Sequence, residues 1–82
     1  MESVEYGVIS AFALITEYKY NYLKNNNNKN FEKLDIDSLD IVEVCIEIEE
    51  KFDLEEIQNN EIENFKTIKD VIDFVETQRN RD

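Results

Sequence analysis

The 82-residue sequence contains no histidine, one cysteine and no apolar run long enough to cross a membrane. Without histidine the chain cannot form the Ser-His or Cys-His pair of a hydrolase, a histidine zinc site or an imidazole acid or base. The single Cys45 allows neither an internal disulfide nor a metal site with two thiolates, so we expect a reducing compartment, the cytoplasm. The longest apolar run, residues 7–15, is too short for a membrane span, and the acidic Glu2 and Glu5 precede it where a signal peptide would be basic. We expect neither secretion nor membrane insertion.

The composition is that of a small folded domain. Apolar residues make up 41% of the sequence and charged residues 35%, with five Phe and four Tyr. A chain of this length buries only about 60–65% of the surface that its unfolded form exposes. We therefore expect residues 1–82 to form one domain with a thin core and no deep enclosed pocket.

The negative charge is confined to one segment. Residues 35–63 contain twelve Asp and Glu against Lys51 alone, whereas the rest of the chain carries eight acidic and eight basic side chains. The whole net charge of −11 therefore belongs to this segment. It would repel nucleic acid and attract a basic protein surface, and the alternative is a solvated face that only improves solubility.

The first third of the chain predicts one helix and a loop. Apolar residues recur at helical spacing over residues 2–22, with Gly7 as a mild fault in the pattern. Six Asn between positions 21 and 30 favour turns and predict a linker loop. We expect Phe31 and Leu34, which follow the Asn tract, to reach into the core.

The remainder predicts three more helices. Asp37 is a good N-cap with Asp40 three residues later, so a long second helix should run from Ser38 to Phe52. Residues 61–65 predict a short third helix, and Thr67 should cap a fourth that ends near residue 78. Its buried stripe should consist of Ile68, Val71, Ile72 and Val75. No strand-like alternation is long enough to compete, so the predicted fold is an all-α, small four-helix bundle with three longer helices and a short third one.

The second helix has two apolar faces. The wider face has the breadth of an ordinary core face, and it consists of Ile41, Val44, Cys45, Ile48 and Phe52. Leu39, Val42 and Ile46 gather on the opposite flank, where a bundle of this size has little left to cover them. The carboxylates that surround this flank are those of Asp40, Glu43, Glu47, Glu49 and Glu50. The pattern indicates either a docking surface with a charged rim or a flank that another segment covers.

The residues around Ser38 resemble a known family signature. The stretch LDIDSLDIVE, residues 34–43, with Glu49-Glu50 and Phe52, is similar to the LGxDSLDxVE…EExF signature of acyl carrier proteins. Downstream, FKTIKDVIDFV, residues 65–75, resembles the closing xTVxDxVxYI stretch of that family. The resemblance covers about residues 31–76, and only helical character and position extend it to the first helix.

The resemblance implies a carrier and not an enzyme. Ser38, flanked by Asp37 and Leu39, would bear a covalent 4′-phosphopantetheine group, and acyl intermediates would be attached to its thiol as thioesters. A separate phosphopantetheinyl transferase would attach the group, so no histidine base is needed. The dipole at the start of the helix would favour the phosphate, which the flanking carboxylates would oppose.

The same resemblance implies partners and a place for the cargo. Acyl-processing enzymes with basic docking surfaces would contact Asp40, Val42, Glu43, Ile46, Glu47, Glu49 and Glu50. Cys45, Ile48 and Phe52 would border the space that shelters a short acyl chain, with Cys45 as a buried apolar residue. We expect a monomer that binds neither nucleic acid nor a membrane. The pathway would be fatty-acid or polyketide-like secondary-metabolite biosynthesis.

Several features depart from the family or suggest alternatives. Asp35 stands where the family usually has Gly, at a loop position that requires a positive φ. The stretch FDLEEIQNNEIENF, residues 52–65, replaces a common Ile-Pro pair, and with the Asn-rich linker it suggests a specialised carrier. The alternatives are a peptidyl carrier of a nonribosomal pathway, whose FxxLGGxSL motif the segment partly fits, and an unmodified interaction module. A calcium loop starting at Asp35 fails at two ligand positions, Leu39 and Ile46, and at the required glycine, where Asp40 stands.

Overall fold

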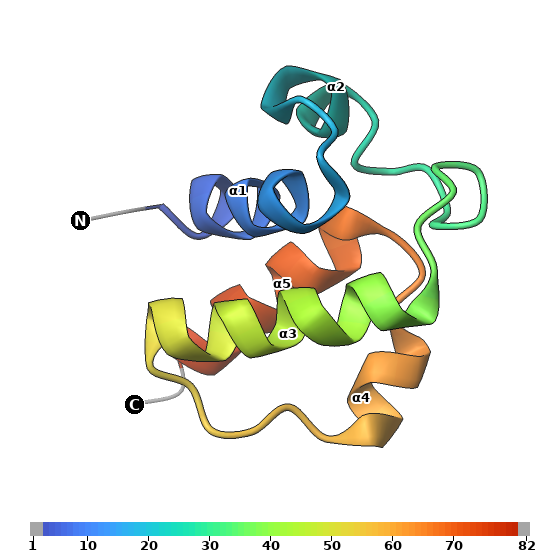
Figure 1. Cartoon of the computed structure of the whole chain (residues 1–82). Helices are drawn as coiled ribbons and strands as arrows, with labels where there is room; N and C mark the ends of the chain where they lie inside the picture. Colours follow the sequence, from blue (N-terminus) through green and yellow to red (C-terminus); the bar gives the residue numbers. More distant parts are fainter. Residues whose placement is uncertain (1–2, 81–82) are drawn as a thin grey trace.

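The computed structural model describes residues 3–80, and within them the chain is helical with connecting loops. Three long helices and two short ones follow one another along the chain: α1 Val4–Thr16, α2 Tyr20–Asn25, α3 Ser38–Phe52, α4 Asn59–Asn64 and α5 Ile68–Arg79. Helix α1 packs against both α3 and α5, whereas α2 lies beside α1 and α4 beside α3 (Figure 1). The predicted all-α bundle is confirmed, with one short helix more than the sequence indicated. None of the described helices combines the length and apolarity that crossing a membrane requires.

The first predicted helix is divided in two. Helix α1 ends at Thr16, because Glu17 adopts the left-handed conformation (φ 67°) and its N–H donates to Ala13 O. The Thr16 hydroxyl donates to Phe12 O at 2.6 Å, which satisfies a carbonyl in the last turn. The prediction of one helix over residues 2–22 was therefore wrong, and so was the loop assigned to the start of the Asn-rich segment. Residue 2 of that prediction lies outside the described residues.

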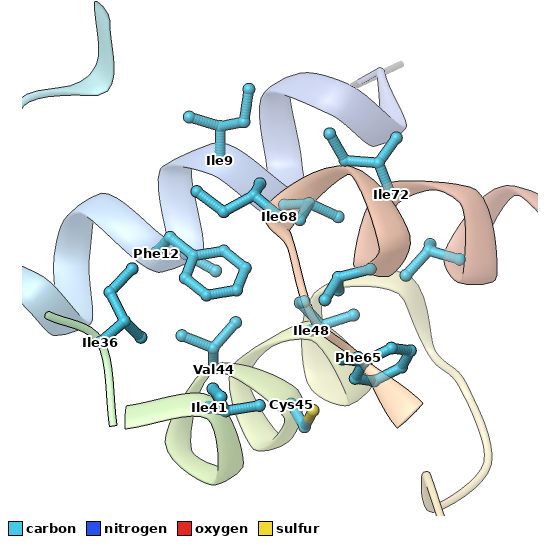
Figure 2. Packing of buried hydrophobic residues seen from close by; sticks show 14 of the residues in the cluster. Ile9, Phe12, Ile36, Ile41, Val44, Cys45, Ile48, Phe65, Ile68 and Ile72 are labelled. Carbon is cyan, nitrogen blue, oxygen red and sulfur yellow. The ribbon is translucent and has the colours of Figure 1, made fainter. Parts of the chain in front are cut away.

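The predicted core residues are buried together. Every residue expected on the core face of α3 is buried, as is the whole stripe predicted for α5. Phe31 and Leu34 are buried as well, although they belong to a loop. Side chains of α1, α3, α5 and the connecting loops meet in one cluster (Figure 2). Because the chain is short, this single cluster supplies most of the apolar burial that stabilises the fold.

Gly7 allows α1 to approach the end of α3 closely. A β-carbon at this position would overlap the Phe52 ring, with Cε2 only 2.9 Å away. The Gly7 carbonyl also accepts a hydrogen bond of 3.3 Å from Lys51 Nζ. The glycine that the sequence pattern marks as a fault is therefore a packing requirement.

The last two helices differ in how they are held. Helix α5 begins at a capping box in which Thr67 Oγ1 accepts from Asp70 N and an Asp70 carboxylate oxygen accepts from Thr67 N. Helix α4, predicted over residues 61–65, lies at Asn59–Asn64 and contains no buried residue. Ile57 before it and Phe65 after it are buried, so α4 is attached to the core through its two flanks.

Candidate functional site

Ser38 is the first residue of α3 and its side chain is exposed. Asp37 is the N-cap: its Oδ1 accepts from Asp40 N at 3.0 Å, and Asp40 Oδ2 accepts from Asp37 N at 3.4 Å. This capping box is the predicted one, and it fixes the first turn of the helix. The serine hydroxyl therefore stands at a defined position at the positive end of the helix dipole, where an anionic substituent is favoured.

The loop that leads to Ser38 is fastened on two sides. Phe31 N donates to Lys66 O at 2.9 Å, beside a bridge between Asn30 and Thr67. On the other side, Tyr18 Oη donates to Leu34 O at 2.7 Å. These contacts join the loop to the α4–α5 turn and to the α1–α2 turn, so the position of Ser38 depends on three separate parts of the chain.

Asp35 adopts the left-handed conformation with a φ of 57°. The expected requirement for a positive φ at this position is therefore confirmed. Asp reaches this region more readily than β-branched or bulky residues do, at a modest energetic cost. The loop consequently keeps its course without glycine, and Ile36, which follows, is buried.

A groove of about 530 Å³ opens beside Ser38. Its lining combines apolar side chains with a polar rim, and it consists of Asn30, Phe31, Glu32, Ile36, Asp37, Ser38, Ile41, Phe65 and Lys66. Cys45, Ile48 and Phe52, which we expected to border a space for the cargo, do not line this groove. These three residues are buried in the core. The loop of residues 31–36 and Phe65 form the wall of the groove instead.

Leu39, Val42 and Ile46 form an exposed apolar flank of α3. Their side chains are 73%, 40% and 51% exposed, so no other described segment covers them. Of the two interpretations open from the sequence, the structure favours the uncovered flank. Clustered exposed aliphatic residues with a charged surround are typical of protein interaction sites.

The carboxylates around this flank are not equivalent. Glu43 and Glu50 are exposed and Glu47 is half-buried. In contrast, Glu49 Oε2 accepts a 2.7 Å hydrogen bond from Ile57 N, and Asp40 caps the helix. Two of the five predicted contact carboxylates are thus committed to holding the chain itself.

Cys45 is buried in the core with 1% of its surface exposed. Desolvation by burial, helped by the negative charge of Glu49, raises the pKa of the thiol from 9.0 to about 11. A thiol in this state is protonated and unreactive near neutral pH. The prediction that Cys45 is a buried apolar residue is confirmed.

The site matches a recognised domain. The family model described as the phosphopantetheine attachment site matches residues 20–75. An acyl carrier protein of Helicobacter hepaticus is 46% identical over 48 residues, which are 58% of this chain and 62% of that protein. One of Chlamydia felis is 40% identical over 55 residues, 67% of this chain and 69% of that protein. The chain thus spans about two thirds of the length of these curated relatives. No solved structure gives a match.

The exposed serine, the groove and the matched domain define a carrier of the phosphopantetheine attachment class. The chain belongs to the acyl carrier protein family, as the DSLD signature and the acidic helix predicted. Members of this family are carriers and not catalysts, and their cofactor is phosphopantetheine.

Sequence reasoning missed the part of the groove that lies at the α4–α5 turn. Asn30, Phe65 and Lys66 were not singled out, because the bridge that brings the loop beside the α4–α5 turn joins residues far apart in the chain. The position of Thr67 was the available signal. It predicts a helix start, and the residues just before a capped helix commonly lie in a turn at the surface.

Proposed function

We propose that Ser38 carries a phosphopantetheine arm and that the chain presents acyl thioesters to other enzymes. The observation that carries the proposal is the exposed Ser38 at the capped start of α3, where it lines a groove of about 530 Å³. The residues present fit the group: the helix start favours the phosphate, and the apolar lining suits the arm and a short acyl chain. When bound, the arm supplies a thiol that forms thioesters.

The chain's own residues hold and present the arm. Asp37 and Asp40 fix the first turn of α3 through their reciprocal hydrogen bonds. Tyr18 and Leu34 fix the preceding loop. In the attachment step a transferase joins Ser38 Oγ to the phosphopantetheine phosphate of coenzyme A, with release of the hydroxyl proton and the remaining nucleotide. No base from this chain is required.

The exposed flank of α3 supports a docking role. Leu39, Val42 and Ile46 offer apolar contact, and Glu43, Glu47 and Glu50 surround them with negative charge. We propose that the transferase and acyl-processing enzymes bind here through basic surfaces, with the apolar centre adding affinity and the charges adding encounter rate. The pathway, in our proposal, is fatty-acid or polyketide-like biosynthesis.

The best argument for the alternative, an unmodified interaction module, is that Asp35 stands where the family usually has glycine. Because this residue adopts the φ of 57° that the loop needs, the replacement of glycine leaves the approach to Ser38 in place. This observation favours the modified carrier.

The test is incubation with coenzyme A and a broad-specificity phosphopantetheinyl transferase, followed by intact mass spectrometry. We expect the protein to gain the mass of one arm. Ser38→Ala should gain none, and Ser10→Ala, which removes a hydroxyl from α1, should gain it normally. Lack of any gain with several transferases, including one from the same organism, would favour the interaction module. Identification of the acyl group on the natively purified protein would then define the pathway.

A further inference from the structure

The groove beside Ser38 has one basic side chain among its lining residues, that of Lys66. The acidic residues that line it are Glu32 and Asp37, and Asp37 directly precedes Ser38. A phosphodiester on Ser38 would therefore add negative charge beside a carboxylate. The helix dipole, equivalent to about half a unit charge, offsets only part of this repulsion. A basic side chain in the groove lining would therefore be favourable.

The backbone of Lys66 is held by two hydrogen bonds at the groove. Its N–H donates to Asp70 Oδ2 at 2.9 Å, and its carbonyl accepts from Phe31 N at 2.9 Å. The side chain is exposed, and its Nζ donates to Glu63 O at 3.3 Å, a long hydrogen bond to a neutral acceptor. An anion in the groove would be a stronger acceptor for the ammonium than this carbonyl.

We propose that Lys66 is a positioning residue that holds the anionic phosphodiester of the arm over the groove. The inference rests on the proposed attachment at Ser38. The ammonium group of Lys66 pairs with the phosphate and biases the arm toward the apolar lining of Phe31, Ile41 and Phe65, away from solvent. The terminal thiol is then partly shielded until a docked enzyme draws the arm out.

Lys69 provides a matched control. It is also an exposed lysine of the α4–α5 region, but it does not line the groove and its Nζ lies 3.2 Å from Asp73. Lys66→Gln and Lys69→Gln therefore remove the same charge from neighbouring positions. Lys66→Arg keeps the charge at the groove.

The experiment measures how fast a neutral maleimide labels the arm thiol of the loaded proteins at low salt. Loading is first verified by intact mass, and the burial of Cys45 restricts labelling to the arm. We expect Lys66→Gln to raise the labelling rate about two- to five-fold, the range of an exposed ion pair. Lys69→Gln and Lys66→Arg should label like the unaltered protein, and at about 1 M salt all four rates should converge because the pair is screened.

Three results would overturn the inference, and they differ in what else they affect. If the loaded Lys66→Gln protein labels at the unaltered rate, or if Lys69→Gln accelerates labelling equally, Lys66 does not position the arm, and the attachment at Ser38 still stands. If the unaltered protein takes up no arm, the proposed function fails and this inference fails with it.

Discussion

Gly7 shows at the scale of a single residue how packing can outweigh helix propensity. In isolation, alanine favours a helix over glycine by about 1 kcal/mol. Here a β-carbon would overlap the Phe52 ring, which is also confined by the Arg79 guanidinium 5.2 Å from its centroid. We expect Gly7→Ala to lower the free energy of unfolding by about 1–2 kcal/mol, as overpacking does. Urea denaturation followed by circular dichroism measures this.

A double mutant tests whether the clash with Phe52 causes the loss of stability expected for Gly7→Ala. If the clash with Phe52 is responsible, Gly7→Ala should cost less in a Phe52→Leu background than in the unaltered protein. Equal costs in both backgrounds, or a gain in stability from Gly7→Ala alone, would show that the close approach is not required.

Because of Cys45, we expect the free energy of unfolding to fall as the pH rises through the alkaline range. Its native pKa of about 11 exceeds the ordinary 9.0, so the unfolded chain loses this proton first as the pH rises. The stabilisation that the neutral, buried thiol gives the folded state is on the order of 2 kcal/mol. It is fully present below pH 9 and is lost between pH 9 and about 11. The pKa of Tyr20 is also raised, by desolvation and by Glu5 and Tyr6, which adds in the same direction.

The measurement is urea unfolding at a series of pH values from 7 to 11. Cys45→Ala should be less stable at pH 7, because it leaves a small cavity, but should lose less stability between pH 9 and 11. An identical alkaline decline in both proteins would contradict the role of the thiol.

At the scale of helices, capping boxes determine where the two best-predicted ones begin. Thr67 Oγ1 accepts from Asp70 N at 3.1 Å at the start of α5. We expect Thr67→Ala to destabilise the protein by about 1 kcal/mol, whereas Thr67→Ser, which retains an acceptor, should cost much less. Thermal denaturation of the two variants tests this, and equal losses would indicate that the methyl group of threonine, not its hydroxyl, is important.

These caps also explain how much could be predicted from the sequence. The bounds of α3 were predicted correctly, because Asp37 marks its start and its apolar residues separate into a buried and an exposed face. The end of α1 was not predictable, because the apolar spacing continues through residues 17–19 while the left-handed Glu17 turns the chain. Local patterns specify a helix and its faces, but a break imposed by tertiary packing has no local signature.

The residues of the candidate site also fall into two groups, those that local sequence predicts and those that only the fold brings together. Ser38 and the exposed Leu39, Val42 and Ile46 follow from local sequence, through the signature and the helical spacing. The groove depends on the contact of the loop with the α4–α5 turn, which only the folded chain shows. The same holds for the hydrogen bond of Glu49 to Ile57 N, which distinguishes this carboxylate from Glu43.

At the scale of the whole molecule, the confinement of negative charge to residues 35–63 should control association with basic partners. We expect Glu43→Lys to slow loading by the transferase about three- to ten-fold at low salt, and less at high salt. Glu43 is the sharper choice, because reversing Glu49 would also remove a hydrogen bond of the fold. Initial loading rates, with circular dichroism to verify folding, measure the effect.

Glu76→Lys is the matched control for this prediction. It makes the same change in net charge at an exposed position of α5, outside the acidic segment. Loading of this variant should stay close to that of the unaltered protein. Equal slowing in the two variants would mean that total charge matters and not the flank of α3.

The attachment of the arm at Ser38 is the central claim, and peptide mass spectrometry tests it directly. Cleavage after Lys33 and Lys51 releases residues 34–51, in which Ser38 is the sole hydroxyl-bearing residue. After loading and reduction, this peptide should carry the mass of one phosphopantetheine, attached at Ser38 on fragmentation. An arm found on any other peptide, or a loaded protein whose 34–51 peptide is unmodified, would contradict the account.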